Sequence, residues 1–256
     1  MKNIALIGYT GFVGGHLKNH FDITHFYNSS NISQIKNKKF DLILCAGAPG
    51  QKWLANLKPE NDKKSIKKLT EALSSTQAKE FILISTVDVY GCPNGVNEKD
   101  LPAPTNAYGN HRYELELFTT RTFKNHHIIR LPGLFGPNLK KNLIFDLLNS
   151  TPIDEINPLS SYQWYPIVNL GHDIKKTISS KIKIINFATE PILNKDLLKT
   201  CFNKELQNSK ANYSVNYNFH TIYAELFNYQ KNYIYKNSDI IFYLKEFINS
   251  QKEEFK

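Results

Sequence analysis

Two side chains that could move a proton together lie four residues apart, Tyr108 and Arg112. In a helix, residues at this spacing share one face, so the guanidinium would lie beside the phenol. We expect this permanent cation to lower the pKa of Tyr108 and to favour proton exchange with a substrate oxygen near neutral pH. The hydroxyl of Thr86 or Ser85 could hydrogen-bond the same oxygen.

A glycine-rich turn near the start of the chain could bind phosphate. It follows the apolar run at residues 4–7 and precedes an amphipathic stretch at residues 13–21. Glycines spaced three apart allow a tight strand-to-helix turn, let a diphosphate approach the main chain, and let the helix pack close to the strand. The positive end of the helix favours the anion. The predicted cofactor contacts in this turn are Gly8, Thr10, Gly11, Phe12, Val13 and Gly14.

The stretch after the second apolar run bears on the choice of cofactor. We predict that Asn28 and Ser29 face the adenosine ribose. An Asp or Glu at this place is typical of NAD, and a nearby arginine is typical of NADP. Residues 27–31 contain none of these. Because a missing carboxylate removes repulsion against a 2′-phosphate, the stretch favours NADP, with NAD as the alternative.

The elements that must position these residues follow an alternating pattern. Short apolar runs alternate with polar segments, and in one of these segments Ile66, Leu69 and Leu73 recur at helical spacing. Strands that alternate with helices predict an α/β fold, a Rossmann-type doubly wound parallel sheet covered on both faces. The predicted strands include residues 4–7, 23–26, 42–45, 81–84 and 128–131.

With these elements in place, the chain resembles the extended short-chain dehydrogenase/reductase superfamily, and within it the NAD(P)-dependent sugar epimerase/dehydratase/reductase group. The matching segments occur in the family's order over about residues 1–190. They are GYTGFVGG (8–15), DLILCAGA (41–48), STVDVYG (85–91), YGNHRYELE (108–116), RLPGLFGP (130–137) and YPIVNLGHD (165–173).

The resemblance implies a nicotinamide over the sheet edge, with Tyr108 as acid/base and Thr86 as its hydroxyl partner. In the family, a lysine four residues after the tyrosine binds the nicotinamide ribose, whereas this chain has Arg112. Arginine keeps the charge, but its planar fork has a different reach, so the exchange is not neutral for activity. Further cofactor contacts implied by the resemblance are Cys45, Ala46, Gly47, Tyr108, Arg112 and Leu131.

The regular alternation ends near residue 132, where prolines become frequent. We therefore predict that residues 1–132 form mainly the dinucleotide-binding core. Residues 133–256 would form mainly a small C-terminal substrate lobe, with segments that return to the core.

Four residues are candidates for substrate binding, and each has an ordinary structural alternative. Asp88 could contact the substrate or serve as a turn or helix-cap acid. Lys141 and Asn142 could bind a diphosphate or begin a solvated helix. Trp164 could stack on a base or sugar, or belong to a local core.

The same resemblance bears on which reaction of the group the chain catalyses. The 4,6-dehydratases of the group carry two adjacent acids after the threonine, but this chain has Val87 and then Asp88, so dehydration is disfavoured. Hydride transfer to a ketone, or epimerisation through a keto intermediate, requires only the cofactor with Tyr108 and Thr86. Because the substrate region is short, we expect an oxidoreductase, an NAD(P)-dependent reductase of a nucleotide-activated keto-sugar. The alternatives are a nucleotide-sugar epimerase of the same family and a non-catalytic NAD(P)-binding regulatory protein.

Composition argues against several other classes of protein. The 32 Lys and Arg against 23 Asp and Glu give a net charge of +9, but the lysines are dispersed, so we expect no nucleic-acid partner. Cys45, Cys92 and Cys201 lie far apart, which indicates a reducing cytoplasm and no metal site. No apolar run approaches the length of a membrane span. On resemblance we expect a homodimer that pairs through helices near residues 61–73 and 107–123.

Overall fold

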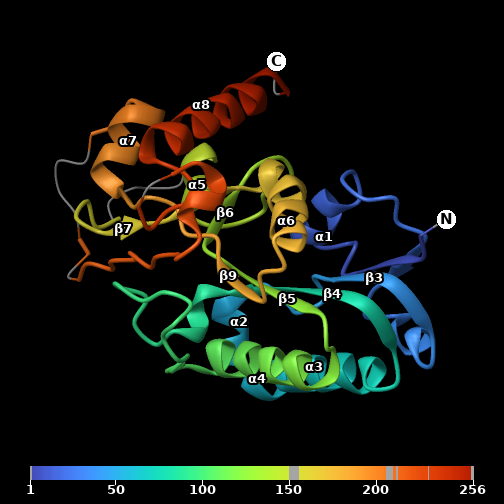
Figure 1. Cartoon of the computed structure of the whole chain (residues 1–256). Helices are drawn as coiled ribbons and strands as arrows, with labels where there is room; N and C mark the ends of the chain where they lie inside the picture. The colour runs from blue at the N-terminus through green and yellow to red at the C-terminus, as the bar shows by residue number, and fades with distance from the viewer. Residues whose placement is uncertain (1, 150–155, 206–209, 212, 230, 255–256) are drawn as a thin grey trace. The chain divides into compact units, whose positions relative to one another are not determined.

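The computed structural model describes residues 2–149, 156–205, 210–211, 213–229 and 231–254 (Figure 1). Its contacts divide the chain into two compact units. The first unit comprises Met1–Cys92, Lys99–Leu131 and Val168–Asn186. The second comprises Pro93–Glu98, Pro132–Ile167 and Phe187–Lys256.

The first unit contains a six-stranded sheet with the order β2-β1-β3-β4-β5-β9, and every neighbouring pair is parallel. This observation confirms the predicted α/β fold with a doubly wound parallel sheet. The order reverses beside β1, which lies between β2 and β3, and in such sheets this is the place where ligands bind. The strands are β1 (Ile4–Ile7), β2 (His25–Tyr27), β3 (Lys39–Cys45), β4 (Gln77–Thr86), β5 (His126–Leu131) and β9 (Ile184–Asn186).

Helices cover both faces of this sheet. In Figure 1, α2, α3 and α4 lie on one face, and α1 and α6 lie on the other. The inner parts of the central strands, such as Ile43 of β3 and Phe81 of β4, are apolar and buried because both faces are covered. The helices of this unit are α1 (Phe12–Leu17), α2 (Lys52–Leu57), α3 (Pro59–Leu73), α4 (Ala107–Thr122) and α6 (Leu170–Ser179), with 3-10 turns η1 (Ile32–Ile35) and η2 (Val87–Val89).

The helical pattern predicted for α3 is confirmed, whereas the predicted extent of α1 is wrong. Ile66, Leu69 and Leu73 are all buried in the core of the sheet. The amphipathic stretch at residues 13–21 forms a helix only as far as Leu17. The following Lys-Asn-His segment contains weaker helix formers and closes tight turns back onto the last helical residues.

The second unit is built from short elements around its own apolar core. Its strands form two small sheets, a parallel pair β6 (Gly133–Phe135) with β8 (Trp164–Pro166) and an antiparallel pair β7 (Ser161–Tyr162) with β10 (Ile192–Leu193). Its core includes Phe135, Trp164, Leu197 and Leu244. The remaining elements are α5 (Leu143–Leu148), α7 (Asn194–Phe202), η4 (Ala224–Phe227) and α8 (Asn237–Glu254).

The close packing of the glycine turn leads to a stability prediction. A Cβ atom at Gly14 would lie 2.1 Å from the carbonyl oxygen of Gly8, which belongs to the backbone and cannot rotate away. We expect Gly14→Ala to lower the free energy of unfolding by about 2 kcal/mol, as overpacking does. The matched control is Gly15→Ala, whose Cβ would have its nearest neighbour 4.0 Å away and which should be neutral or slightly stabilising. Urea unfolding measures both, and equal effects would contradict the close approach.

Candidate active site

The glycine turn and the end of β3 form one surface beside β1. Gly8 has a φ of +85°, and its N–H donates to the carbonyl oxygen of Tyr27 at 2.8 Å, which ties the turn to β2. A Cβ at Gly8 would lie 2.2 Å from the carbonyl oxygen of Ala46. Only glycine fits at this position, because the backbone angle and the neighbouring chain both exclude a side chain.

This turn fits the diphosphate of a dinucleotide. The N-cap residue of α1 is Gly11, which has no side chain to accept a hydrogen bond from the first N–H groups of the helix. These N–H groups have no partner within the helix and attract an anion. The backbone of the predicted contacts Thr10, Phe12 and Val13 lies along this turn, at the start of α1.

The loop after β2 is organised by Asn28. Its amide nitrogen donates to the Tyr9 hydroxyl at 3.3 Å, and its side-chain oxygen accepts from the Ser30 hydroxyl at 2.6 Å. Lys68 of α3 donates to the carbonyl oxygen of Ser29 at 2.6 Å. An ammonium therefore lies beside the loop predicted to face the ribose. Sequence reasoning missed Lys68, because it lies 39 residues away and belongs to no motif.

The contacts predicted at the ends of β3 and β5 differ in their accessibility. Cys45 is fully buried in the core, and burial raises the pKa of its thiol to about 12. Ala46 and Gly47 follow it at the strand end and are partly exposed. Leu131 pairs with Thr86 across β4 and β5. The backbone after Cys45, rather than its thiol, is thus the part of this segment that a ligand could reach.

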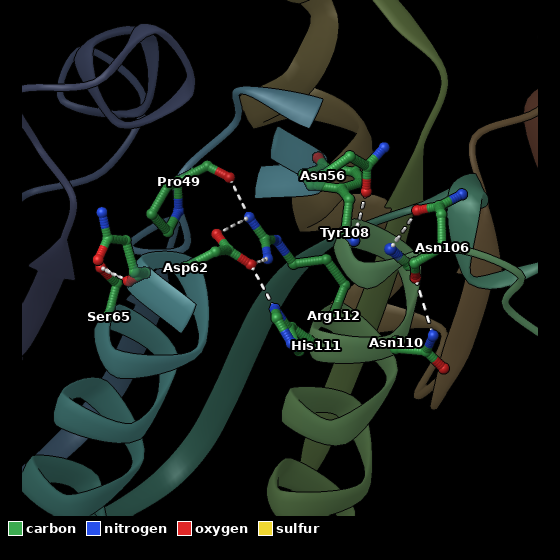
Figure 2. Close-up of polar contacts among 11 residues, drawn as sticks. Pro49, Asn56, Asp62, Ser65, Asn106, Tyr108, Asn110, His111 and Arg112 are labelled. Carbon is green, nitrogen blue, oxygen red and sulfur yellow. Dashed lines mark hydrogen bonds and ion pairs between the residues drawn. The ribbon is translucent and has the colours of Figure 1, made fainter. Parts of the chain in front are cut away.

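Tyr108 is positioned by the first turn of α4. Asn106 caps this helix by accepting from the Gly109 N–H at 3.0 Å, and the Tyr108 N–H donates to the side-chain oxygen of Asn56 at 2.9 Å (Figure 2). A Cβ at Gly109 would lie 2.3 Å from the carbonyl oxygen of Asp88, so this glycine lets α4 lie directly against η2. This close approach brings the phenol to the end of β4.

Of the two candidate hydroxyls, Thr86 is the one that meets the phenol. Its side chain hydrogen-bonds Tyr108. The Ser85 hydroxyl instead donates at 2.6 Å to Glu116, which also forms a buried ion pair with Arg130 at 2.7 Å. The side chains of successive strand residues point to opposite faces of the sheet, which explains why the two hydroxyls have different partners. Ser85 thus belongs to a buried network behind the phenol.

The predicted lowering of the Tyr108 pKa is wrong. Burial is the largest influence and raises the pKa, because the phenolate would lose its hydration. The charge of Arg112 and the hydrogen bond from Thr86 lower it, whereas the carboxylate of Asp88 raises it. The sum is a pKa above the ordinary value, because burial outweighs the influences that favour the phenolate.

Arg112 is engaged in a buried ion pair, which the sequence did not reveal. Its guanidinium donates to both carboxylate oxygens of Asp62, at 2.6 and 3.0 Å, and also to the carbonyl oxygen of Pro49 (Figure 2). His111 lies 2.7 Å from the same carboxylate. The guanidinium carbon is 4.2 Å from the centre of the Tyr108 ring. Arg112 therefore stacks on the tyrosine while it ties α4 to α3 and to the loop after β3.

Asp88 lies close to the phenol and forms an ion pair of its own. Its carboxylate accepts from the ammonium of Lys52 at 2.6 Å, and its N–H donates to the Thr86 hydroxyl at 3.2 Å. Asp88 thus combines the turn role that the sequence left open with a place beside the reactive pair. Lys52, at the start of α2, is a second residue that sequence reasoning missed.

The substrate candidates of the second unit take structural roles within it. Asn142 caps α5 by accepting from the Phe145 N–H at 3.1 Å and donates to the carbonyl oxygen of Leu134 at 2.8 Å. Lys141 precedes this cap, and burial lowers its pKa. Trp164 is 4% exposed and belongs to the core of the unit, which was the alternative offered for it.

The described residues contain no group of three or more His, Cys, Asp or Glu side chains that could hold a metal ion. None of the helices in this part of the chain combines the length and apolar character that a membrane crossing needs.

Comparison with known proteins identifies the class. A sequence model of the NAD dependent epimerase/dehydratase family matches residues 20–152, more than half of the chain. The fold and this match define an NAD(P)-dependent oxidoreductase or epimerase, the class predicted from the sequence. The chain belongs to the NAD dependent epimerase/dehydratase family, which confirms the resemblance. No curated protein sequence matches it.

Solved structures share the fold at low sequence identity. The UDP-N-acetylglucosamine 4-epimerase from Methanobrevibacter ruminantium M1 has a TM-score of 0.80 and 13% identity over 99% of both chains. The dTDP-4-dehydrorhamnose reductase from Clostridium acetobutylicum ATCC 824 has 0.76 and 18%, over 98% of this chain and 99% of that one. The reductase from Bacillus anthracis str. Ames, in complex with NADP, has 0.74 and 16%, over 97% and 98%.

The ion pair of Asp62 and Arg112 yields a prediction about stability and pH. We expect Asp62→Asn to lower the free energy of unfolding at neutral pH by about 3 kcal/mol, because it leaves a buried guanidinium without its carboxylate. Burial alone would raise the pKa of Asp62, but the hydrogen bonds from Arg112 and His111 outweigh it, and the pKa lies below its ordinary value. The carboxylate therefore stabilises fully above its unfolded pKa of about 4 and loses this effect as pH falls through the folded pKa.

Urea unfolding between acidic and neutral pH checks this prediction. The difference between the natural chain and Asp62→Asn should be largest near neutral pH and shrink in acid. The matched control is Asp41→Asn, which removes a carboxylate whose partner Lys79 is 80% exposed, and its effect should be much smaller. A difference that persists unchanged into acid would contradict the role of the charge.

Proposed function

We propose that this protein is an NAD(P)-dependent reductase of a nucleotide-activated keto-sugar. The observation that carries the proposal is the buried Tyr108 phenol, hydrogen-bonded by Thr86 in the same unit as the glycine turn. A bound nicotinamide supplies the hydride for the ketone carbon. The similarity to epimerases and reductases whose names include UDP- and dTDP-sugars supports a nucleotide sugar as the substrate class.

In this proposal Tyr108 is the acid. Burial favours the protonated phenol, which can donate its proton to the ketone oxygen as that oxygen gains electrons. Thr86 hydrogen-bonds the phenol and would hold the same oxygen in line. Arg112 stacks on the ring and keeps it in place. Tyr108 and Thr86 thus act on the same oxygen, and Arg112 positions the ring.

Reduction and the alternative of epimerisation require different protonation states of the phenol. An epimerase must first remove a proton from a sugar hydroxyl, for which a phenolate is needed. Reduction begins from the protonated phenol, the form that burial favours. The two reactions differ in a direct way, since only reduction consumes NADPH or NADH in proportion to product. A regulatory protein would bind the cofactor without this consumption.

A single substitution tests the proposal. We expect Tyr108→Phe to lower kcat by about 10²–10⁴-fold, because it removes the proton donor, while the Kd for NADPH and NADH changes little. The measurement is NAD(P)H consumption against a panel of nucleotide keto-sugars, with cofactor binding followed by fluorescence. Tyr113→Phe, on the same helix, is the matched control and should keep full turnover. Undiminished turnover in Tyr108→Phe would remove this tyrosine from the mechanism.

Preference for NADP over NAD belongs to the same proposal. The loop after β2 has no carboxylate to repel a 2′-phosphate, and the carbonyl oxygen of Ser29 accepts from the ammonium of Lys68. An ammonium at this loop could move the short distance from the carbonyl to a phosphate oxygen. A phosphate offers it a full negative charge, which makes the stronger hydrogen bond.

Cofactor titration of a lysine variant tests this preference. We expect Lys68→Ala to raise the Kd for NADPH by about tenfold, the cost of one charge-assisted hydrogen bond, and to leave the Kd for NADH nearly unchanged. Lys67→Ala is the matched control, since Lys67 is also exposed on α3 and pairs with Glu71 at 3.8 Å. Equal losses for NADPH and NADH would show that Lys68 does not distinguish the two cofactors.

Other predictions from the sequence complete this proposal. We propose that the second unit binds the nucleotide sugar, with Lys141 and Asn142 near its diphosphate. A homodimer that pairs through α3 and α4 and a cytoplasmic location stay predictions.

A further inference from the structure

The buried phenol of Tyr108 is influenced by charges from three elements. Arg112 lies on its own helix α4, Asp88 lies in η2, and Lys52 lies in α2. Burial has the largest effect and raises the pKa of the phenol; the two cations lower it and the carboxylate raises it further. When the phenol gives up its proton it becomes an anion, so the balance among these charges decides how readily it does so.

Arg112, whose guanidinium carbon lies 4.2 Å from the centre of the Tyr108 ring, is already paired with another carboxylate. It forms two hydrogen bonds with Asp62, and both side chains are almost fully buried, at 3% and 4% exposed. His111 adds a further contact with the same carboxylate. Because the charges of Arg112 and Asp62 oppose each other at short range, the phenol feels only part of the field of the guanidinium.

Lys52 reaches the phenol by a different route. Its ammonium, on a side chain that is 41% exposed, donates to Asp88 at 2.6 Å. The Asp88 N–H donates to the Thr86 hydroxyl at 3.2 Å, and a carboxylate oxygen of Asp88 lies 3.4 Å from that hydroxyl. Thr86 in turn hydrogen-bonds Tyr108. A continuous row of polar groups therefore leads from a partly exposed ammonium to the buried phenol.

We infer that Lys52 is a positioning residue that acts through Asp88 and Thr86 to govern the protonation of the Tyr108 phenol. This inference rests on the proposed function, in which Tyr108 passes its proton to a ketone oxygen and regains one from water. The Asp88 carboxylate opposes the phenolate that forms in between. Lys52 offsets the negative charge of this carboxylate, so that the phenolate can form. Asp88 can then orient Thr86 without blocking the loss of the proton.

The first test follows the phenol directly and needs no substrate. In the full chain labelled with [13Cζ]tyrosine, the resonance of Tyr108 is assigned with Tyr108→Phe and titrated toward high pH, with circular dichroism to confirm that the fold persists. We expect Lys52→Met to raise the pKa of Tyr108, because Asp88 loses its counter-charge. Asp88→Asn should lower it, because the opposing anion is gone, and Lys52→Arg should stay close to the natural chain.

Opposite shifts distinguish a charge effect from a structural contact. Either substitution breaks the ion pair of Lys52 and Asp88, so a merely structural role would change both variants in the same direction or neither. The matched control is Lys58→Met, which removes an exposed lysine next to the end of α2 and should leave the titration unchanged. Shifts in one direction, or no shift in Lys52→Met, would overturn the inference.

The second test uses turnover with a keto-sugar that the natural chain reduces. We expect Lys52→Met to lower kcat on the order of tenfold with little change in KM, since a weaker acid slows proton transfer rather than binding. The basic limb of the kcat profile should move to higher pH in Lys52→Met and to lower pH in Asp88→Asn, and Lys52→Arg should restore kcat. Unchanged profiles in both variants would overturn the inference.

The two tests separate failure of the inference from failure of the proposed function. A natural chain that reduces no keto-sugar in the panel contradicts the proposed reductase. In that case the titration of Tyr108 still decides whether Lys52 and Asp88 govern the phenol.

Discussion

A buried carboxylate between two helices holds the candidate active site together. Asp62 of α3 accepts two hydrogen bonds from Arg112 of α4, and Arg112 also donates to the carbonyl oxygen of Pro49 after β3. Removal of either partner would leave the other charge buried without a counter-charge, which is costly. Tyr108 lies one turn before Arg112 and stacks on its guanidinium. The place of the phenol therefore depends on this ion pair.

The burial that positions the phenol also sets its chemistry. A phenol removed from water holds its proton, because the anion would lose its hydration. In such surroundings each nearby charge acts more strongly than in water. Arg112, Asp88 and Lys52 therefore matter to Tyr108 although their charges partly oppose one another. A protonated phenol whose anion is stabilised by nearby cations is suited to give a proton to an oxygen that gains negative charge.

Local features of the chain allowed much of the fold and part of the site to be predicted. The alternation of apolar runs led to the parallel sheet, and the glycines led to the turn where Gly8 fits closely against Ala46. The four-residue spacing of Tyr108 and Arg112 correctly predicted that the guanidinium lies beside the ring. The same reasoning failed on the direction of the Tyr108 pKa, because no short stretch of sequence reveals how deeply a side chain is buried.

The sequence by itself determined the class of fold, the family and the residue types at the sheet edge, because periodicity and glycine spacing act over a few neighbouring residues. Only the tertiary structure decided which charges surround the phenol. Asp62 lies 50 residues from Arg112, and Lys52 lies 36 residues from Asp88. It also decided that Thr86, rather than Ser85, meets Tyr108. Burial and ion pairing depend on neighbours in space, which the chain acquires only when the helices pack on the sheet.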